Sequence, residues 1–158
     1  MEKNVYLDLG YWVQKKAKQL GASQSALGIN HSRSVSVDYR DGKVETLKES
    51  TQQSLWIELF AGGRYSSHST NDLRKESLEK FLTNAVDLTG FLTKDEFRRL
   101  ADPKLYEGQS KVDLDLNDSG QADITAEQRQ ERAKQLGAYL EGKDERIISV
   151  ASGFYDSH

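Results

Sequence analysis

Polar and apolar residues alternate strictly over residues 34–39, which read Ser-Val-Ser-Val-Asp-Tyr. Successive side chains of a β-strand point to opposite faces, so this alternation is typical of a strand with one buried face. The residues that the pattern places on that face are Val35, Val37 and Tyr39. The segment belongs to a block from Gly21 to Asn71 that we interpret as a run of antiparallel strands.

Two glycine-containing turns divide this block. Asp41-Gly42 follows the alternating segment, and an extended pattern resumes over residues 44–47. A second apolar run over residues 55–60 reaches Gly62-Gly63 and returns over residues 64–69. Asp-Gly and Gly-Gly tolerate the positive φ angles of tight hairpin turns, so the block predicts about four antiparallel strands in a row.

Helical spacing of apolar residues appears on both sides of the block. The apolar residues within residues 4–20 form one stripe, which predicts a helix, and Gly21 is a C-cap residue for this helix. The stripe consists of Val5, Leu9, Trp12, Val13, Ala17 and Leu20. After the block, Ser69, Thr70 and Asn71 offer N-cap oxygens for a second helix that Gly90 ends. Its stripe consists of Leu78, Phe81, Leu82, Ala85 and Val86.

The rest of the chain is less regular. Residues 93–100 predict a short helix because acidic residues come first and basic residues last, as the helix dipole prefers. Asp102-Pro103 contains the one proline and should break that helix. Residues 107–123 are polar and are interpreted as a surface connection.

A third helix and a final strand follow this connection. Residues 125–128 read Thr-Ala-Glu-Gln, a capping box that should open a helix running to about Glu141, before Gly142. The apolar face of this helix is thin and consists of Ala126, Ala133, Leu136 and Leu140. Residues 146–150 then start a strand that must join the meander or await a further segment.

This order of elements predicts an α+β fold, with an antiparallel β-meander sheet packed against two to three helices. With 158 residues, the chain is long enough for one domain, or for one domain and a fragment of another, with a sizeable core. Its hydrophobic share is 36% and its charged share is 30%, so the surface is well solvated.

Charge and composition remove several classes of function. A net charge of −3 argues against a nucleic-acid groove, which needs a basic surface. The absence of cysteine excludes disulfides, thiolate chemistry and cysteine-based zinc sites in this chain. No apolar run is long enough for a membrane helix and the first residues lack the pattern of a signal peptide. We therefore expect a cytoplasmic protein that does not bind a membrane.

The histidines are poor candidates for a metal site. His31 and His68 both fall in predicted strands and could lie near one another, while His158 is the last residue. A zinc site needs three or four ligands, and no HExxH or HExxxH spacing occurs here. Ordinary strand positions are the better interpretation of both residues.

Serine- and glycine-rich segments also have simpler interpretations. Residues 66–69 read Ser-Ser-His-Ser, but no Gly-x-Ser-x-Gly elbow is present, so the segment fits the polar face of an edge strand. The loop over residues 61–64 is followed by a strand and not by a helix N-terminus, so it fits a hairpin turn better than a phosphate site. Trp12 and Trp56 fit core or half-buried positions on the first helix and on a strand.

Residues 115–127 partly match a calcium-binding loop. Its ligand positions 1, 3, 5 and 9 and the invariant glycine would be Asp115, Asn117, Ser119, Asp123 and Gly120. Position 12, which should be a bidentate glutamate, is Ala126, and Glu127 comes one residue late. A turn before a capped helix is the favoured interpretation, and calcium binding by a stand-alone module is kept as an alternative.

Several short motifs occur in an order that resembles one known family. They are Ser34–Thr46, Ala61–Arg64, Ser69–Leu73, Leu100–Pro103, Leu114–Leu116, Ile124–Gln128, Glu145–Ile147 and Phe154–His158. Together they resemble the N-terminal domain of the TldD/PmbA family, also known as modulator of DNA gyrase, over about residues 5–158. The last of them is most similar to the PmbA (TldE) branch. The resemblance implies a family domain over residues 1–143 and a strand over residues 144–158 that leads into a remainder absent from this chain.

The family implies more chemistry than this chain carries. Its TldD-like subunit is similar to a zinc peptidase with a His-Glu-x-x-x-His helix, and the PmbA-like subunit lacks that metal set and pairs with TldD. None of these ligands matches a position here, so we assign no catalytic, cofactor-binding or metal residue and leave open whether the protein is an enzyme. Zinc would belong to the TldD-like partner.

The resemblance implies the non-metal subunit of a peptidase complex in peptide maturation or degradation. Its N-terminal domain would act as a scaffold, a subunit contact and a wall of the peptide channel. The partners would be a TldD-like subunit or a second copy, together with a peptide substrate that an exposed sheet edge could accept as an added strand. A TldD-like zinc metallopeptidase is the alternative identity.

Overall fold

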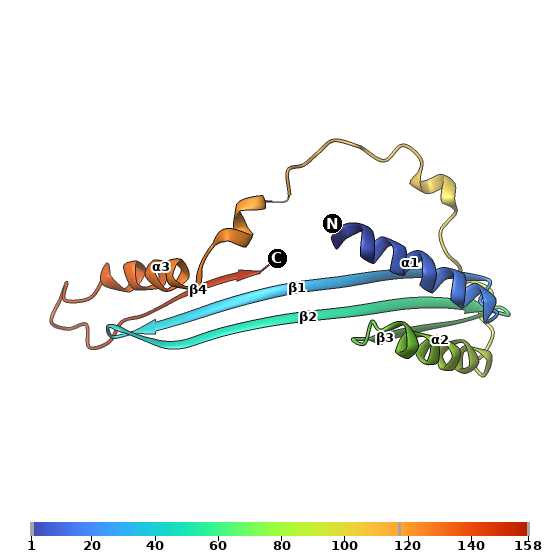
Figure 1. Cartoon of the computed structure of the whole chain (residues 1–158), viewed down its shortest axis with the longest axis horizontal. Coiled ribbons are helices and arrows are strands. Elements are labelled where there is room, and N and C mark those ends of the chain that lie inside the picture. The colour runs from blue at the N-terminus through green and yellow to red at the C-terminus, as the bar shows by residue number, and fades with distance from the viewer. Residues whose placement is uncertain (1, 117, 158) are drawn as a thin grey trace. The chain divides into compact units, whose positions relative to one another are not determined.

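The computed structural model describes residues 2–116 and 118–157, and it leaves out the side chains of residues 2–4, 119 and 122. The main elements in chain order are α1 (Glu2–Gln19), β1 (Gln24–Arg40), β2 (Lys43–Ala61), β3 (Arg64–Thr70), α2 (Lys75–Gly90), α3 (Ala126–Ala138) and β4 (Ala151–Ser157) (Figure 1). Two short 3₁₀ helices, η1 (Pro103–Tyr106) and η2 (Ser119–Asp123), lie in the connection before α3. The strands form one sheet in the order β3-β2-β1-β4, which confirms the predicted α+β class.

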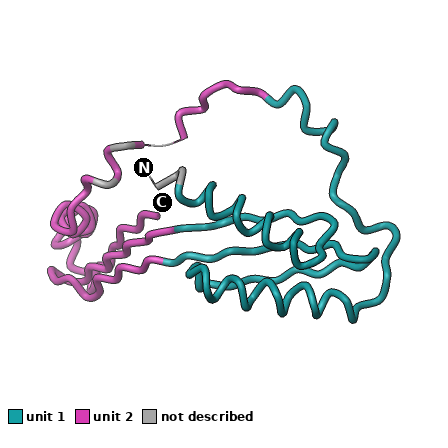
Figure 2. Tube along the Cα trace, turned by 45° about the vertical axis from the view of Figure 1, so that its right-hand side comes forward, with its two compact units in different colours: residues 1–31, 52–109 teal, residues 32–51, 110–158 magenta. Residues whose placement is uncertain are grey.

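The chain divides into two compact units (Figure 2). Unit 1 consists of residues 1–31 and 52–109, and unit 2 consists of residues 32–51 and 110–158. Each long strand therefore contributes one part to each unit. The predicted division at residues 143 and 144 stays a prediction.

Unit 1 has an apolar core between its helices and its part of the sheet. Leu55, Ile57 and Leu59 of β2 are fully buried, and they pack with α1 and α2. The buried helix residues are Val13 and Ala17 of α1 and Leu78, Leu82, Ala85 and Val86 of α2. All six were predicted by helical spacing. Of the other predicted stripe residues, Leu9, Trp12, Leu20 and Phe81 are partly buried, and Val5 is exposed, so that part of the prediction is wrong. Helix α1 ends as predicted, because Gly21 adopts a φ of 111°.

Unit 2 has a much smaller core. Val37 and Tyr39 of β1 pack with Ala133 of α3, and Phe154 of β4 joins them partly buried. Val35 is also buried, so the face predicted for residues 34–39 is confirmed. The packing of α3 rests on residues that contribute little apolar surface.

Both predicted hairpin turns are present. Asp41 and Gly42 have φ angles of 47° and 82°, and Gly62 and Gly63 have φ angles of 56° and 75°. Positive φ at both central residues is the geometry of a type I′ turn, whose twist suits a two-residue hairpin. These turns connect β1 to β2 and β2 to β3.

The prediction of about four strands in a row is wrong, because three are present. Residues 44–47 and 55–60 belong to one strand, β2, which has 19 residues. The intervening residues 48–54 are polar and largely exposed, but they contain no turn-forming glycine or proline, so the strand continues through them. The fourth strand of the sheet is β4, which joins β1 in antiparallel register, with Val35 opposite Asp156.

The predicted strand start at Arg146 is also wrong, since β4 begins at Ala151. Asp41 fixes the residues just before the strand: its amide donates to Val150 O, and its carboxylate accepts from Val150 N at 2.8 Å. The Ser149 hydroxyl donates to the same carboxylate at 2.8 Å. These bonds satisfy backbone groups that a continued ladder would otherwise pair.

Two helix predictions fail in unit 1. Residues 93–100 form turns and not a helix, because Asp95 N donates to Gly63 O and the Asp95 side chain accepts from Phe97 N. Helix α2 begins at Lys75 with Arg74 as its N-cap residue, so Ser69, Thr70 and Asn71 do not cap it. Asp102 and Pro103 start η1, in which the Asp102 side chain accepts from Lys104 N.

Helix α3 has the predicted start and a different buried face. Thr125 and Gln128 form the capping box, but the helix ends at Ala138 and not near Glu141. Its buried residues are Arg129, Ala133 and Gly137, one turn apart, whereas Leu136 is 61% exposed and Leu140 is 55% exposed. The predicted apolar face is therefore wrong except at Ala133. No helix of the described residues is both long and apolar enough to cross a membrane.

Candidate functional site

One edge of β1 in unit 1 has no partner strand among the described residues. The pairing of β1 with β4 covers Ser34–Arg40 and lies in unit 2. On that side of β1, none of the described strands pairs with residues 24–31. An open edge presents main-chain N–H and C=O groups that can pair with another extended chain.

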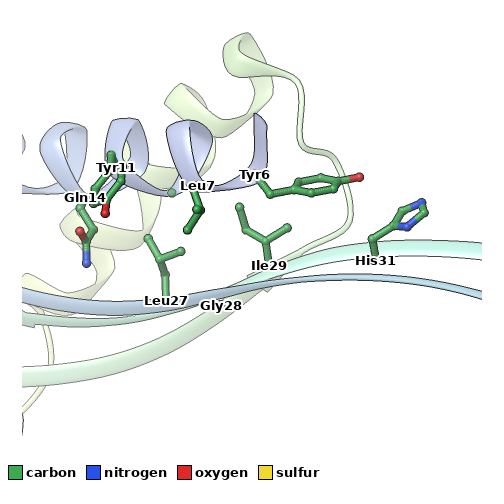
Figure 3. A pocket seen from close by; sticks show the side chains of 9 residues that line it. Tyr6, Leu7, Tyr11, Gln14, Leu27, Gly28, Ile29 and His31 are labelled. Carbon is green, nitrogen blue, oxygen red and sulfur yellow. The ribbon is translucent and has the colours of Figure 1, made fainter. Parts of the chain in front are cut away.

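An apolar groove lies beside this edge, between α1 and β1 (Figure 3). Its volume is about 590 Å³, and both of its walls belong to unit 1. The residues that line it are Tyr6, Leu7, Gly10, Tyr11 and Gln14 of α1 and Leu27, Gly28, Ile29 and His31 of β1. Figure 3 shows Leu27 and Ile29 on the same side of β1, directed toward α1.

Helix α1 carries two neighbouring apolar stripes. One contains Val13 and Ala17 and is buried in the core of unit 1. The other contains Leu7 and Tyr11, one turn apart, which are 51% and 68% exposed. Because residues four apart lie on the same face of a helix, this second stripe forms a continuous wall along the groove.

The floor of the groove follows from strand geometry. Leu27, Ile29 and His31 alternate with Gly28 and Asn30, so their side chains lie on one face about 7 Å apart. A chain added beside β1 would place every second side chain next to these three. The edge and the groove therefore place main-chain hydrogen-bonding groups beside apolar surface.

An aromatic pair closes one end of the groove. The rings of Tyr6 and His31 stack with centroids 6.0 Å apart and an angle of 29° between their planes. His31 is exposed although it takes part in this stack, and Figure 3 shows Tyr6 reaching along the groove toward it. Stacking against Tyr6 is thus the role that the structure shows for His31.

Two glycines shape the groove in different ways. A Cβ atom on Gly28 would come within 2.4 Å of Trp56 Nε1, so Trp56, which is half exposed, fills the space that a side chain would need. A Cβ atom on Gly10 would meet only Leu27 Cδ1 at 3.5 Å, an ordinary contact. Substitution at Gly10 can therefore change the groove without displacing the core.

The chemistry of the groove is that of binding. The nine lining residues include no carboxylate, and their one imidazole is stacked on Tyr6. Bond cleavage by acid–base or nucleophilic catalysis needs paired groups at hydrogen-bonding distance, which these residues do not supply. The groove offers shape, apolar surface and a main-chain edge.

The other predicted strand histidine, His68, has a structural role. Its Nε2 lies 2.8 Å from Ser66 Oγ, and its ring meets Phe81 edge-on. Thr89 donates its hydroxyl proton to Ala85 O, so its oxygen accepts from Ser66, and Ser66 in turn accepts from His68. This chain of hydrogen bonds ties β3 to α2, and burial lowers the pKa of His68. Ser66 is buried and its proton is committed to Thr89, which does not suit a nucleophile.

The two histidines have different neighbours in the structure. His31 contacts Tyr6, whereas His68 contacts Ser66 and Phe81. Among the described residues, no group of three or more His, Asp or Glu side chains is arranged to hold a metal ion.

The segment that partly matches a calcium-binding loop contains a short turn before α3. Asp118 accepts from Gly120 N at 2.8 Å and caps η2, which ends at Asp123. Asn117 lies outside the described residues. The interpretation of this segment as a turn before a capped helix is confirmed, because η2 leads directly to the capping box at Thr125.

Sequence reasoning missed the groove. The stripe predicted for residues 4–20 contained Leu9, Val13 and Ala17 but not Leu7 or Tyr11. The signal that was missed is a second apolar stripe on the same helix. A helix that packs on one side only carries a single apolar stripe, so a second stripe indicates a second apolar surface.

Comparisons with known proteins give one consistent family. Residues 26–89 match the family model described as PmbA/TldA metallopeptidase domain 1. Metalloprotease PmbA of Escherichia coli O157:H7 is 25% identical over 139 residues, which cover 87% of this chain and 30% of that protein. The Metalloprotease PmbA homolog of Haemophilus influenzae is 26% identical over 142 residues, which cover 90% of this chain and 31% of that protein.

Solved structures agree with this result. A crystal structure from Bacteroides thetaiotaomicron, of a protein known by the name modulator of DNA gyrase, has a TM-score of 0.88 and 37% identity, and the match covers 95% of this chain and 34% of that one. TldE of Thermococcus kodakarensis has a TM-score of 0.71 at 10% identity, with 94% and 33% covered, which shows a common fold. The chain spans about 30% of the length of the curated relatives that it matches.

Proposed function

We propose that this chain is a member of the PmbA/TldD family and forms the first domain of a PmbA-like (TldE-like) subunit, the non-metal partner in a cytoplasmic peptidase complex. In that complex it serves as a scaffold, contacts the TldD-like subunit and forms a wall of the path taken by the peptide. Zinc and bond cleavage belong to the TldD-like subunit. The peptide substrates are those of maturation or degradation.

The observation that carries this proposal is the open edge of β1 beside the apolar groove. An extended peptide gains main-chain hydrogen bonds from such an edge whatever its sequence, and it gains affinity from alternate side chains placed on apolar surface. The relatives named metalloprotease act on polypeptides, so a site of this shape has a clear use in their family.

A binding measurement on the 158-residue chain tests the proposal. A fluorescein-labelled heptapeptide with leucine at alternate positions and threonine between them should bind, as measured by fluorescence polarisation. Methylation of the backbone nitrogens that face β1 should abolish binding, because it removes donors from the ladder without changing the side chains. Equal binding of the methylated peptide would contradict docking along the edge.

Gly10 supplies a matched pair of protein variants. Gly10→Leu places a bulky side chain in the groove and should weaken peptide binding at least tenfold, whereas Gly10→Ala adds a single methyl group in ordinary contact with Leu27 and should bind within about twofold. If both variants bind like the unsubstituted chain, the peptide lies elsewhere.

A TldD-like metallopeptidase is the second candidate, because the matching family model is described as a metallopeptidase domain. None of the family's metal ligands matches a position in this chain, so the segment encoded after His158 separates the two. The proposal predicts neither stoichiometric zinc nor peptide turnover for this chain, and either result would contradict it. A His-Glu-x-x-x-His segment encoded after His158 would also decide for the second candidate.

A further inference from the structure

We propose that the Tyr6–His31 pair is a specificity subsite that selects an aromatic side chain in the bound peptide. This inference rests on the proposed docking of an extended peptide in the groove of unit 1. It assigns a residue preference to one position of that peptide and a function to two residues.

The first step concerns spacing. Leu27, Ile29 and His31 occupy three successive positions on one face of β1, so a strand added at the free edge brings its residues i, i+2 and i+4 beside them. The first two positions of the peptide meet Leu27 and Ile29 below α1, with Leu7 between the helix and the strand (Figure 3). Both of these positions favour aliphatic side chains.

The third position meets a different surface. Beside His31, the wall of the groove is the ring of Tyr6, and the two rings already stack at 6.0 Å. Because His31 is exposed, its ring can accept a further aromatic group from the peptide. Stacked or edge-to-face aromatic pairs favour centroid distances of about 4.5–7 Å, which one added ring reaches here.

Charge decides between an aromatic and an acidic side chain at this position. None of the nine lining residues is lysine, arginine, aspartate or glutamate. A carboxylate that entered the groove would lose hydration without gaining a permanent positive partner. An aromatic ring loses little hydration and gains contact with two rings, so we infer a peptide pattern of aliphatic, any, aliphatic, any, aromatic.

The pattern is tested with three peptides of equal length. Their alternate residues are Leu, Leu and Phe, or Leu, Leu and Ala, or Leu, Leu and Asp, with threonine between them. The Phe peptide should bind about three- to tenfold more tightly than the Ala peptide, the size expected for one aromatic pair. The Asp peptide should bind no better than the Ala peptide.

Variants at His31 assign this preference to the proposed subsite. His31→Ala should bind all three peptides with similar affinity and should still bind the Ala peptide as the unsubstituted chain does. His31→Phe keeps an aromatic ring and should retain the preference. Because His31 is exposed, both variant proteins should fold, and circular dichroism of each variant checks this.

The outcomes separate this inference from the proposed function. Peptide binding without a preference for Phe, or a preference that persists in His31→Ala, overturns the subsite and leaves docking in the groove intact. Tighter binding of the Asp peptide also overturns it. Failure of all three peptides to bind overturns the proposed function together with the subsite.

Discussion

Different interactions stabilise the interior of each compact unit of this chain. In unit 1, two helices bury leucine, isoleucine and valine side chains against the sheet. In unit 2, the buried face of α3 includes Arg129, whose side chain is 2% exposed and forms an ion pair with Asp156 at 2.6 Å. Apolar packing adds up over many contacts, whereas a buried ion pair depends on both partners being present.

The ion pair of unit 2 links α3 to β4. Arg129 Nε donates to Asp156, and Arg129 Nη1 donates to Ile124 O just before the helix. Within the described part of the chain, Arg129 Nη2 and Asp156 Oδ1 have no hydrogen-bond partner. A buried pair with unsatisfied atoms contributes specificity of register more than stability.

The largest effect is expected from breaking this pair. Asp156→Ala leaves the buried guanidinium of Arg129 without its counter-charge and should lower the free energy of unfolding by about 3–5 kcal/mol. Urea unfolding followed by circular dichroism measures this change. The double variant Arg129→Met with Asp156→Leu should recover most of the loss, because it removes both charges. If Asp156→Ala lowers the free energy of unfolding by less than about 1 kcal/mol, unit 2 does not depend on this ion pair and the difference between the units is contradicted.

The next effect is a cavity in the core of unit 1. Leu82 is fully buried in α2, so Leu82→Ala should cost about 2–5 kcal/mol in the same unfolding measurement. Leu88, on the same helix and 56% exposed, is the matched control, and Leu88→Ala should change stability by less than about 0.5 kcal/mol. Similar costs for both substitutions would show that α2 does not depend on its buried face.

A smaller effect is expected at the start of α3. Thr125 accepts from Gln128 N, and the Gln128 side chain accepts from Thr125 N at 2.8 Å. Thr125→Ala removes this cap and should cost about 1 kcal/mol, while Thr125→Ser should be nearly neutral because it keeps the hydroxyl. Since α3 buries little apolar surface, hydrogen exchange of its first turn should rise in the alanine variant. Unchanged exchange would show that packing alone holds the helix.

The smallest effect is a dependence on pH in unit 2. Hydrogen bonds from Val150 N and Ser149 lower the pKa of Asp41 below its ordinary value of 3.8. The stability that these bonds contribute is therefore present above that value and is lost as the pH falls through the lower pKa of the folded state. Amide exchange at Val150 should accelerate in acid, and Asp41→Asn should remove this pH dependence. Exchange that does not change with acid would contradict the assignment.

Local sequence signals predicted much of the fold because their physical causes are local. The type I′ turns at Asp41-Gly42 and Gly62-Gly63 need residues that tolerate positive φ, and the sequence shows them directly. The capping box at Thr125 also depends only on residues close together in the sequence. The stripes of α1 and α2 were predicted correctly apart from Val5, which is exposed, because both helices pack on a large apolar core.

The predictions that failed concern segments whose structure depends on residues far away in the chain. Residues 93–100 had helical charge placement, but Asp95 bonds to Gly63 instead. The strand predicted at Arg146 was delayed by the hydrogen bonds to Asp41, which is more than a hundred residues away in the chain. The leucines of α3 were assigned to the buried face, and only the position of Asp156 shows why Arg129 takes that place.

The sequence by itself determined the α+β class, the two hairpins and the family resemblance, because alternation, turn residues and ordered motifs are properties of the chain. Only the tertiary structure decided that β4 pairs with part of β1 and that, in the described part of the chain, no strand pairs with the edge at residues 24–31 beside the groove. Strand pairing and groove shape depend on which distant segments meet, and this depends on the summed packing and hydrogen bonding of the whole fold.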